Sequence, residues 1–247
     1  MVPREEARGT IIIVGGHMTW PVSYRRLARI LANLSGFEVH VASITPWDWI
    51  LGRIHGYGQL VFEVATTVDK ALLESSSDKA VLVAHSAGGI LARVYLGGDP
   101  PYGGRRYAGY RRVSHLITLG TPHNVPNEGR LTPIAEVDML FPGILHKPKG
   151  LRYFCVAGAA VDGAVSSKAR KRYERFVGDG RVKGDGEVPV ETALLSGAEP
   201  LVLDGVYHGR FHSFRRKRWY GSDRETVERW WPEELHVRER LVEEPRA

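Results

Sequence analysis

The chain has 247 residues, of which 43% are hydrophobic and 25% charged, and its formal net charge at pH 7 is +6. These values exclude a disordered chain and allow a single α/β domain over residues 1–247, because no linker-like segment divides the sequence. No apolar run approaches the roughly 18 residues that span a bilayer, and residues 1–8 lack the apolar stretch of a secretory signal.

The only cysteine, Cys155, excludes an intrachain disulfide and favours a reducing compartment, so we expect a cytoplasmic protein. Cys155 lies in an apolar run, which predicts a buried, inert thiol. The isoelectric point of about 9.5 would suit nucleic acid or an anionic membrane surface as a partner. No zinc-finger spacing, basic leucine zipper or other nucleic-acid-binding motif occurs, so we expect no nucleic acid and keep the membrane surface open.

Apolar runs and helical apolar spacing alternate along the chain. In chain order they predict a strand at residues 10–14, a helix at 23–33 with Ser23 as N-cap, a strand at 37–41 and a helix at 59–74. They continue with a strand at 80–84, a helix at 88–96, and strands at 113–119, 153–157 and 201–203. This alternation predicts a mostly parallel, twisted sheet with helices on both faces, in which ligands bind beyond the carboxyl ends of the strands.

Two segments depart from this alternation. Residues 124–150 carry prolines near both ends and a short amphipathic stretch between them. They predict either an ordinary helix packed on the core or a lid over the functional site, because long excursions in compact domains are often functional. Residues 221–247 are expected to form a C-terminal helical tail.

The pentapeptide Ala-His-Ser-Ala-Gly at residues 84–88 joins a predicted strand directly to a predicted helix. Small residues on both sides of Ser86 allow strand and helix to pack closely around a strained turn, the nucleophile elbow, which holds the hydroxyl out at the sheet edge. The helix N-terminus then offers the backbone N–H of Ala87 to a developing oxyanion. The glycine pair directly after the first strand predicts the backbone N–H of His17 as the second donor of this oxyanion hole.

A serine hydroxyl needs a base to accept its proton and a carboxylate to orient that base. Where such an elbow occurs, the order along the chain is serine, acid, histidine. Asp185 lies in a glycine-flanked turn downstream of Ser86 and is the predicted acid. Asp162 is the main rival because it follows a predicted strand closely, and Asp179 and Asp204 are further rivals. For each aspartate the alternative is a plain surface turn.

The predicted base is His208, which lies in the loop after the last predicted strand. His212 stays open as the alternative base. His85 and His123 are expected to have structural roles near the site. The histidines lack the His-x-x-Glu-His-like spacing of zinc enzymes, and one cysteine cannot build a thiolate cluster, so we expect neither a metal nor a cofactor.

Several short segments carry a family resemblance. They are Trp47-Asp48-Trp49, residues 84–89 with 92–95, Gly120-Thr121-Pro122-His123, Gly184-Asp185-Gly186 with Val188-Pro189, residues 203–208 and Trp219-Tyr220-Gly221. In these segments, spread from about residue 10 to 231, the chain resembles α/β-hydrolases of the lipase/esterase type. It is similar in particular to lipase-like hydrolases of cyanobacteria and chloroplasts, and distantly to GPI inositol-deacylase-like hydrolases.

The sequence departs from these relatives at two places. Gly15-Gly16 stands where many relatives have Pro-Gly or His-Gly, and residues 215–218 form a basic insertion. The resemblance as a whole implies an α/β-hydrolase fold and hydrolysis of carboxylic esters without a cofactor.

We therefore predict a serine esterase or lipase that cleaves a small-molecule or lipid ester through an acyl-enzyme. An acyltransferase on the same machinery, in which an alcohol replaces water, is one alternative. A hydrolase fold retained only to bind a lipid or a protein partner is the other. The segment 210–218, where basic residues alternate with aromatic ones, is either a solvated loop or a contact with anionic head groups.

Overall fold

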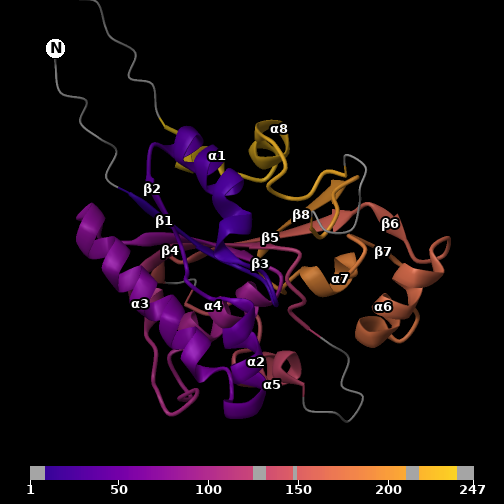
Figure 1. The fold of residues 1–247 in the computed structure, drawn as a ribbon, viewed down its shortest axis with the longest axis horizontal. Helices are drawn as coiled ribbons and strands as arrows, with labels where there is room; N and C mark the ends of the chain where they lie inside the picture. Colours follow the sequence, from indigo (N-terminus) through magenta and orange to yellow (C-terminus); the bar gives the residue numbers. More distant parts are fainter. Residues whose placement is uncertain (1–8, 125–131, 147–148, 210–216, 238–247) are drawn as a thin grey trace, which may run out of the picture.

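The computed structural model of the protein describes residues 9–124, 132–146, 149–209 and 217–237 (Figure 1). Its centre is a six-stranded parallel sheet with the strand order β2-β1-β3-β4-β5-β8. The strands are β1 (Thr10–Val14), β2 (Glu38–Val41), β3 (Ala80–His85), β4 (Val113–Leu119), β5 (Arg152–Ala159) and β8 (Glu199–Asp204). The predicted parallel sheet is thus confirmed. A separate antiparallel pair contains β6 (Val161–Asp162) and β7 (Lys183–Gly184).

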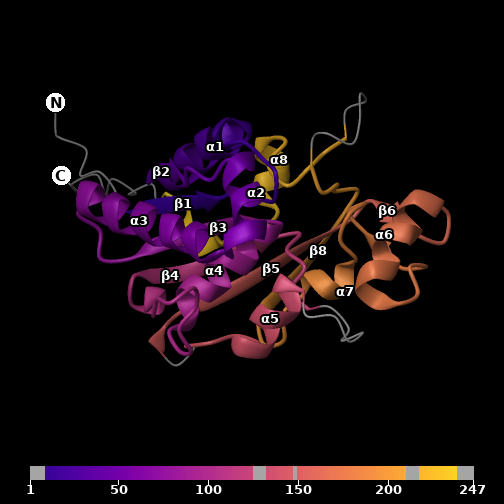
Figure 2. The same cartoon turned by 60° about the horizontal axis from the view of Figure 1, so that its bottom comes forward.

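The helices of the described residues surround this sheet (Figures 1 and 2). They are α1 (Arg25–Ser35), α2 (Pro46–His55), α3 (Gly58–Ser75), α4 (Ala87–Gly97), α5 (Pro133–Leu140), α6 (Ser167–Val177), α7 (Val190–Ala193) and α8 (Arg224–Glu228). The described residues also contain the 3-10 turns η1 (Pro21–Tyr24), η2 (Gly109–Arg111) and η5 (Glu233–Leu235). None of the helices in the described ranges combines the length and the apolar content needed to cross a membrane.

Alternating side chains of β1 build the two halves of the core. Ile11 and Ile13 pack with the buried residues of α1 and α8, whereas Ile12 and Val14 pack with those of α3 and α4. Because side chains alternate across a strand, a strand that is covered on both faces is apolar at every position. This is why residues 10–14 form a continuous apolar run in the sequence.

The parallel arrangement collects the predicted site at one edge of the sheet. Ser86 directly follows β3, His17 comes shortly after β1, and His208 comes shortly after β8. The carboxyl ends of parallel strands meet at one edge, where open α/β sheets bind their ligands. Residues far apart in sequence therefore come to the same edge because the strands before them run parallel in one sheet.

The start of the first helix differs from the prediction. Residues 21–24 form the 3-10 turn η1 with Pro21 at its start, and α1 begins only at Arg25. Ser23 lies inside the turn, where its N–H bonds to the carbonyl of Trp20, and is therefore not an N-cap. The fixed φ of proline suits the first position of a helical turn, so the helical backbone begins at Pro21, upstream of Ser23, as a 3-10 turn that leads into α1.

Three of the segments discussed above lie partly outside the described residues. Of residues 124–150, the structure describes 124, 132–146 and 149–150, and 133–140 of these form α5. The prediction that this segment is a lid stays a prediction. Of residues 221–247, the structure describes 221–237, which contain α8 and the turn η5. Most of the basic segment, residues 210–216, lies outside the described residues, as does His212.

Candidate active site

The turn between β3 and α4 holds Ser86 in a strained conformation, with φ of 53° and ψ of −130°. This turn requires glycine at two neighbouring positions. A Cβ on Gly88 would lie 2.4 Å from the carbonyl oxygen of Val14, and one on Gly89 would lie 2.2 Å from Thr121 Oγ1. Helix α4 can therefore pack against β1 and the loop after β4 only because both side chains are absent. Strain of this kind concentrates at functional sites.

The three residues predicted from the sequence as nucleophile, base and acid form one hydrogen-bonded chain. Ser86 Oγ lies 2.9 Å from His208 Nε2, and His208 Nδ1 lies 2.7 Å from Asp185 Oδ2. An ionised carboxylate only accepts hydrogen bonds, so Nδ1 carries the proton and Nε2 is free to accept the proton of Ser86. The structure thus brings these residues together in the arrangement that activates a serine hydroxyl.

Asp185 is fully buried, yet its environment keeps it ionised. Its Oδ1 accepts hydrogen bonds from the backbone N–H groups of Glu187 (3.0 Å) and Val188 (2.8 Å). Its Oδ2 accepts from Tyr220 as well as from His208. Burial alone would raise the pKa of Asp185, but the charge of His208 and these hydrogen bonds lower it below the ordinary value.

The charge of Asp185 acts in turn on His208. Burial alone would lower the pKa of His208, but the neighbouring carboxylate and its hydrogen bond raise it above the ordinary value. The backbone holds the two residues together as well, because the N–H of His208 donates to the carbonyl of Asp185 at 2.9 Å. His208 is therefore well placed to accept a proton from Ser86 and to keep it while Asp185 remains charged.

The rival aspartates occupy different places. Asp162 Oδ1 accepts from the backbone N–H of Ala164 (2.7 Å), and Asp179 Oδ1 accepts from that of Arg181 (3.0 Å), so both close local turns. Asp204 ends β8 and is exposed. Among the described residues, only Asp185 forms a carboxylate contact with His208.

His85 connects the elbow to two other loops. Its Nε2 lies 2.8 Å from the carbonyl oxygen of His208, and its Nδ1 lies 2.8 Å from the hydroxyl of Tyr24. A carbonyl only accepts, so Nε2 donates and Nδ1 accepts from Tyr24, whose oxygen in turn accepts from the N–H of Gly16. This arrangement needs a neutral ring, and burial, with the nearby charge of His208, lowers the pKa of His85 to about 3.

Sequence reasoning expected a structural role for His85 but missed Tyr24. The chain Gly16–Tyr24–His85–His208 ties the loop after β1 to the loop after β8, on either side of the elbow. The sequence offered only a tyrosine shortly after a glycine pair. Its partners lie too far along the chain to be identified without the fold.

The backbone N–H groups of His17 and Ala87, predicted as oxyanion donors, lie in the loop after β1 and at the start of α4. Among the described residues, neither group has a hydrogen-bond partner. The loop approaches the nucleophile so closely that a Cβ on Gly16 would lie 2.9 Å from the Cβ of Ser86. Both N–H groups are therefore available for an anionic oxygen next to Ser86.

A largely apolar cavity of about 160 Å³ opens beside these two residues. Its wall contains His17 and Ala87 together with side chains from α2, α4 and α5, namely Trp49, Ile90, Leu91, Val94, Pro133, Ile134 and Val137, and with Tyr57 and Tyr102. It is a suitable place for an apolar group attached to a carbonyl at Ser86.

Arg93 of α4 holds α5 in place as part of this wall. The buried guanidinium donates to Asp138 Oδ1 at 2.9 Å, to the carbonyl of Phe141 at 2.6 Å and to the carbonyl of His123 at 2.8 Å. His123 is itself buried, and its Nε2 lies 2.9 Å from Thr118 Oγ1. These contacts connect the elbow helix, the loop after β4 and α5, which supports the structural role expected for His123.

Cys155 is buried, and burial raises the pKa of its thiol, which disfavours the reactive thiolate. Within the described ranges, no three His, Cys, Asp or Glu side chains are grouped in a way that could hold a metal ion.

Tyr220 is a further residue of the site that sequence reasoning missed. Its hydroxyl donates to Asp185 Oδ2 at 2.9 Å and accepts from the N–H of Gly158 at 2.7 Å. Its presence in Trp219-Tyr220-Gly221, a segment of the family resemblance, was the available signal. Because it bonds the same oxygen as His208, it positions the acid and lowers the acid's affinity for a proton.

We expect Tyr220→Phe to lower kcat by roughly 10-fold to 100-fold with little change in KM, since a hydrogen bond to a charged group contributes about 1.5–3 kcal/mol. The carboxylate would become more basic and raise the pKa of His208, so the acid limb of the pH–rate profile should move to higher pH. Steady-state kinetics across pH on soluble esters measures both effects. Tyr110→Phe, at the surface, is the control; an unshifted acid limb would contradict this role for Tyr220.

No protein-family model matches the sequence, and no curated protein matches it. Among solved structures, the chain is similar to the lipase BlEst2 of Bacillus licheniformis, with a TM-score of 0.59, 17% sequence identity and 94% of each chain covered. The phospholipase PlaB of Legionella pneumophila has a TM-score of 0.49 at 15% identity, with 82% of this chain and 54% of that chain covered. A CIB-like hydrolase of Thermoplasma acidophilum has a TM-score of 0.46 at 12% identity, with 93% of this chain and 86% of that chain covered.

The similarity to BlEst2 covers nearly the whole of both chains, and at this identity it concerns the fold. It agrees with the parallel sheet that has helices on both faces. The chain has the α/β-hydrolase fold.

Proposed function

We propose that this protein is a serine hydrolase that cleaves carboxylic esters, an esterase or lipase, through an acyl-enzyme intermediate. The observation that carries the proposal is the continuous hydrogen-bonded chain from Ser86 through His208 to Asp185. It lies at the edge of the sheet where α/β folds bind ligands, beside an apolar cavity. The single cysteine continues to favour a cytoplasmic location.

In the proposed reaction, Ser86 Oγ attacks the ester carbonyl while His208 Nε2 accepts the hydroxyl proton. Asp185 remains ionised and stabilises the imidazolium. The carbonyl oxygen becomes an oxyanion that the N–H groups of His17 and Ala87 stabilise. His208 then protonates the leaving alcohol, and the acyl group stays on Ser86. Water, activated by the same histidine, releases the acid and restores the serine.

Labelling with a fluorophosphonate tests this proposal directly, because the reagent modifies only an activated serine. We expect stoichiometric labelling of the wild-type protein at Ser86, together with hydrolysis of p-nitrophenyl esters. A protein that neither reacts nor hydrolyses would instead be a hydrolase fold retained for binding. Adding an alcohol to the assay separates hydrolysis from acyl transfer, since a transferase would form a new ester in place of the free acid.

The cavity predicts the length of the acyl group. An engineered protein cavity of about 150 Å³ holds a benzene molecule, so about 160 Å³ has room for about six carbon atoms. Among p-nitrophenyl esters, kcat/KM should therefore increase from acetate to about hexanoate and rise no further for longer chains. The measurement is a series of esters in detergent-free buffer.

Ile134 of α5 lines this cavity and allows the assignment to be checked. We expect Ile134→Trp to lower kcat/KM for the hexanoate by about tenfold or more, because hydrophobic pockets discriminate at about 1–3 kcal/mol per methylene. The acetate should change less than twofold, since it does not reach this wall. Ile134→Ala is the matched control and should extend the range towards longer chains. Equal losses for acetate and hexanoate would show that the acyl group lies elsewhere.

A further inference from the structure

Helix α2 presents an apolar face to solvent. The face consists of Trp47, Ile50, Leu51 and Ile54, whose exposed fractions are 64%, 38%, 53% and 70%. Their spacing of three and four residues places them in one stripe along the helix. A water-exposed helix normally carries polar side chains in this position, so the stripe needs an explanation.

The opposite side of α2 takes part in the candidate active site. Trp49 is buried, lines the apolar cavity beside Ala87, and contacts the ring of His17 edge-on with a centroid distance of 5.2 Å. Met18, the next residue after His17, is itself 45% exposed. The same short helix thus separates the cavity from solvent and turns its apolar face outwards beside the oxyanion loop.

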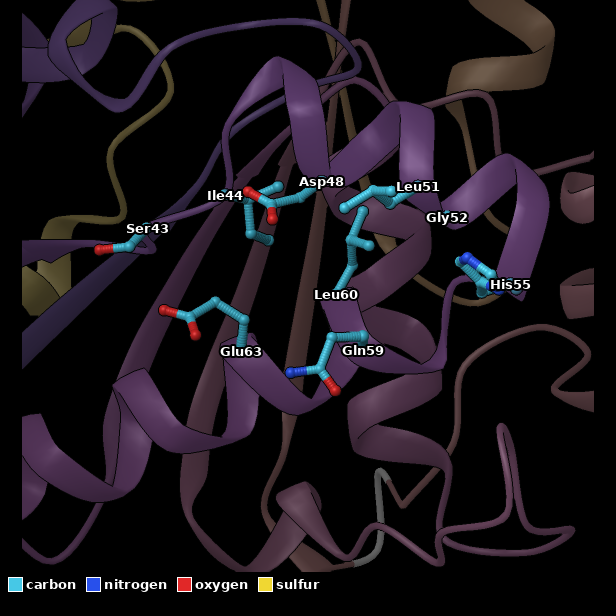
Figure 3. A pocket seen from close by; sticks show the side chains of 10 residues that line it. Ser43, Ile44, Asp48, Leu51, Gly52, His55, Gln59, Leu60 and Glu63 are labelled. Atoms are coloured by element: carbon cyan, nitrogen blue, oxygen red, sulfur yellow. The ribbon is translucent and has the colours of Figure 1, made fainter.

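A groove borders α2 on its flank. It has a volume of about 280 Å³ and lies between α2 and α3. Figure 3 shows Asp48, Leu51 and His55 of α2 on one side of it and Gln59 and Glu63 of α3 on the other. Leu51 therefore belongs both to the apolar face and to the lining of this groove.

Charged side chains of both signs lie near this face, since Asp48 and Glu63 line the adjoining groove. Arg53 follows the stripe on the exposed side of α2, and among the described residues it has no ion-pair partner. Asp48, the acidic residue of α2, accepts hydrogen bonds from the N–H and hydroxyl of Thr45 as a capping box. The chain as a whole carries a formal net charge of +6. The net positive charge of the chain and the exposed Arg53 favour an anionic surface.

The exposed area of the apolar face is too small for a stable protein complex and favours a lipid as its partner. The exposed parts of four such side chains amount to about 400 Å², whereas each partner in a stable protein complex buries about 800 Å². A helix with tryptophan at one end, an apolar stripe and a basic edge is instead typical of helices that lie in the surface of a bilayer.

We propose that α2 inserts its apolar face into the surface of a phospholipid bilayer with anionic head groups, and that this contact positions the cavity next to ester substrates dissolved in the lipid. The substrate part of this inference rests on the proposed function; the membrane contact does not. About six carbons of an acyl chain occupy the cavity, and the rest of a longer chain remains in the lipid beside α2.

The test uses vesicles of phosphatidylcholine and phosphatidylglycerol and the full-length protein. Co-sedimentation of wild type is compared with the double variant Trp47→Gln/Ile54→Gln. We expect the partition coefficient of the double variant to fall at least tenfold at low and at moderate salt. The matched control is Leu73→Gln/Val165→Gln, which removes two strongly exposed apolar side chains outside the face and should bind like wild type. Equal binding of wild type and Trp47→Gln/Ile54→Gln would overturn the proposal.

Tryptophan fluorescence locates the contact without relying on a destabilising change. Trp49, Trp219, Trp230 and Trp231 are buried, so a blue shift of the emission on adding vesicles should come mainly from an exposed tryptophan. Trp47→Phe keeps an apolar side chain, and we expect it to bind but to lose most of the shift. Trp20→Phe should retain the shift; the reverse pattern would place the contact at the loop after β1 and overturn the assignment to α2.

Two further measurements separate this inference from its competitors. Hydrolysis of p-nitrophenyl acetate by Trp47→Gln/Ile54→Gln should stay within twofold of wild type. Vesicle binding without hydrolysis by wild type would disprove only the proposed function, whereas hydrolysis without vesicle binding would disprove only the membrane contact.

Analytical ultracentrifugation should show a monomer for wild type and the double variant alike. A wild-type dimer that Trp47→Gln/Ile54→Gln dissociates would assign the face to a second copy and overturn the proposal.

Discussion

Ser86→Ala is expected to abolish ester hydrolysis, with a loss of kcat of roughly 10⁶-fold, the size of effect seen when the nucleophile of a serine protease is removed. The hydroxyl of Ser86 is the atom that would form the acyl-enzyme, and within the described residues its hydrogen-bond partner is His208 Nε2. Alanine keeps the small size that the turn between β3 and α4 requires, so the fold should be retained. The measurement is hydrolysis of p-nitrophenyl butyrate together with thermal unfolding.

Ser43→Ala is the matched control, because Ser43 is exposed, lies in the groove beside α2 and should be dispensable for hydrolysis. Fluorophosphonate labelling should disappear in Ser86→Ala and persist in Ser43→Ala. Hydrolysis by Ser86→Ala near the wild-type rate would exclude the proposed acyl-enzyme and leave the protein without its assigned nucleophile.

Asp185→Asn is expected to lower kcat by roughly 10⁴-fold, the effect of the corresponding change in serine proteases. Asparagine preserves the shape of the side chain but can donate to His208 Nδ1, which stabilises the tautomer with its proton on Nε2. In that tautomer Nε2 cannot accept the proton of Ser86. The remaining activity should also show a changed pH dependence.

The direction of this change follows from the charge. The base must be neutral to accept a proton, so kcat/KM falls as the pH drops through the pKa of His208. Asp185 is the group that raises this pKa, and Asn removes its charge, so the acid limb should move to lower pH. Asp162→Asn is the matched control, because Asp162 closes a turn by accepting from Ala164. If Asp162→Asn were inactive and Asp185→Asn active, the acid would have to be reassigned.

Patterns within the chain were sufficient for the elements that are buried or chemically constrained. The strands of the parallel sheet were predicted from runs of apolar residues, which are longest where a strand is buried on both faces, as in β1 and β3. The edge strands β2 and β8 are partly exposed and were predicted from shorter apolar runs. The elbow was predicted because the strained turn at Ser86 admits only small residues around it. Helix α2 was not predicted, because its apolar residues face two ways, with Trp49 towards the cavity and Trp47 towards solvent, and no single buried stripe marks it.

The sequence by itself determined the fold class and proposed candidates for a site, since the order of serine, acid and histidine and their places after strands can be recognised along the chain. Only the tertiary structure decided which aspartate meets His208, because Asp185, Asp162 and Asp179 all lie in turns and differ only in where the turn packs. It also revealed Tyr24 and Tyr220, whose hydroxyls bond groups 61 and 35 residues away. The physical reason is that a hydrogen bond needs about 3 Å in space and leaves no periodic trace in sequence.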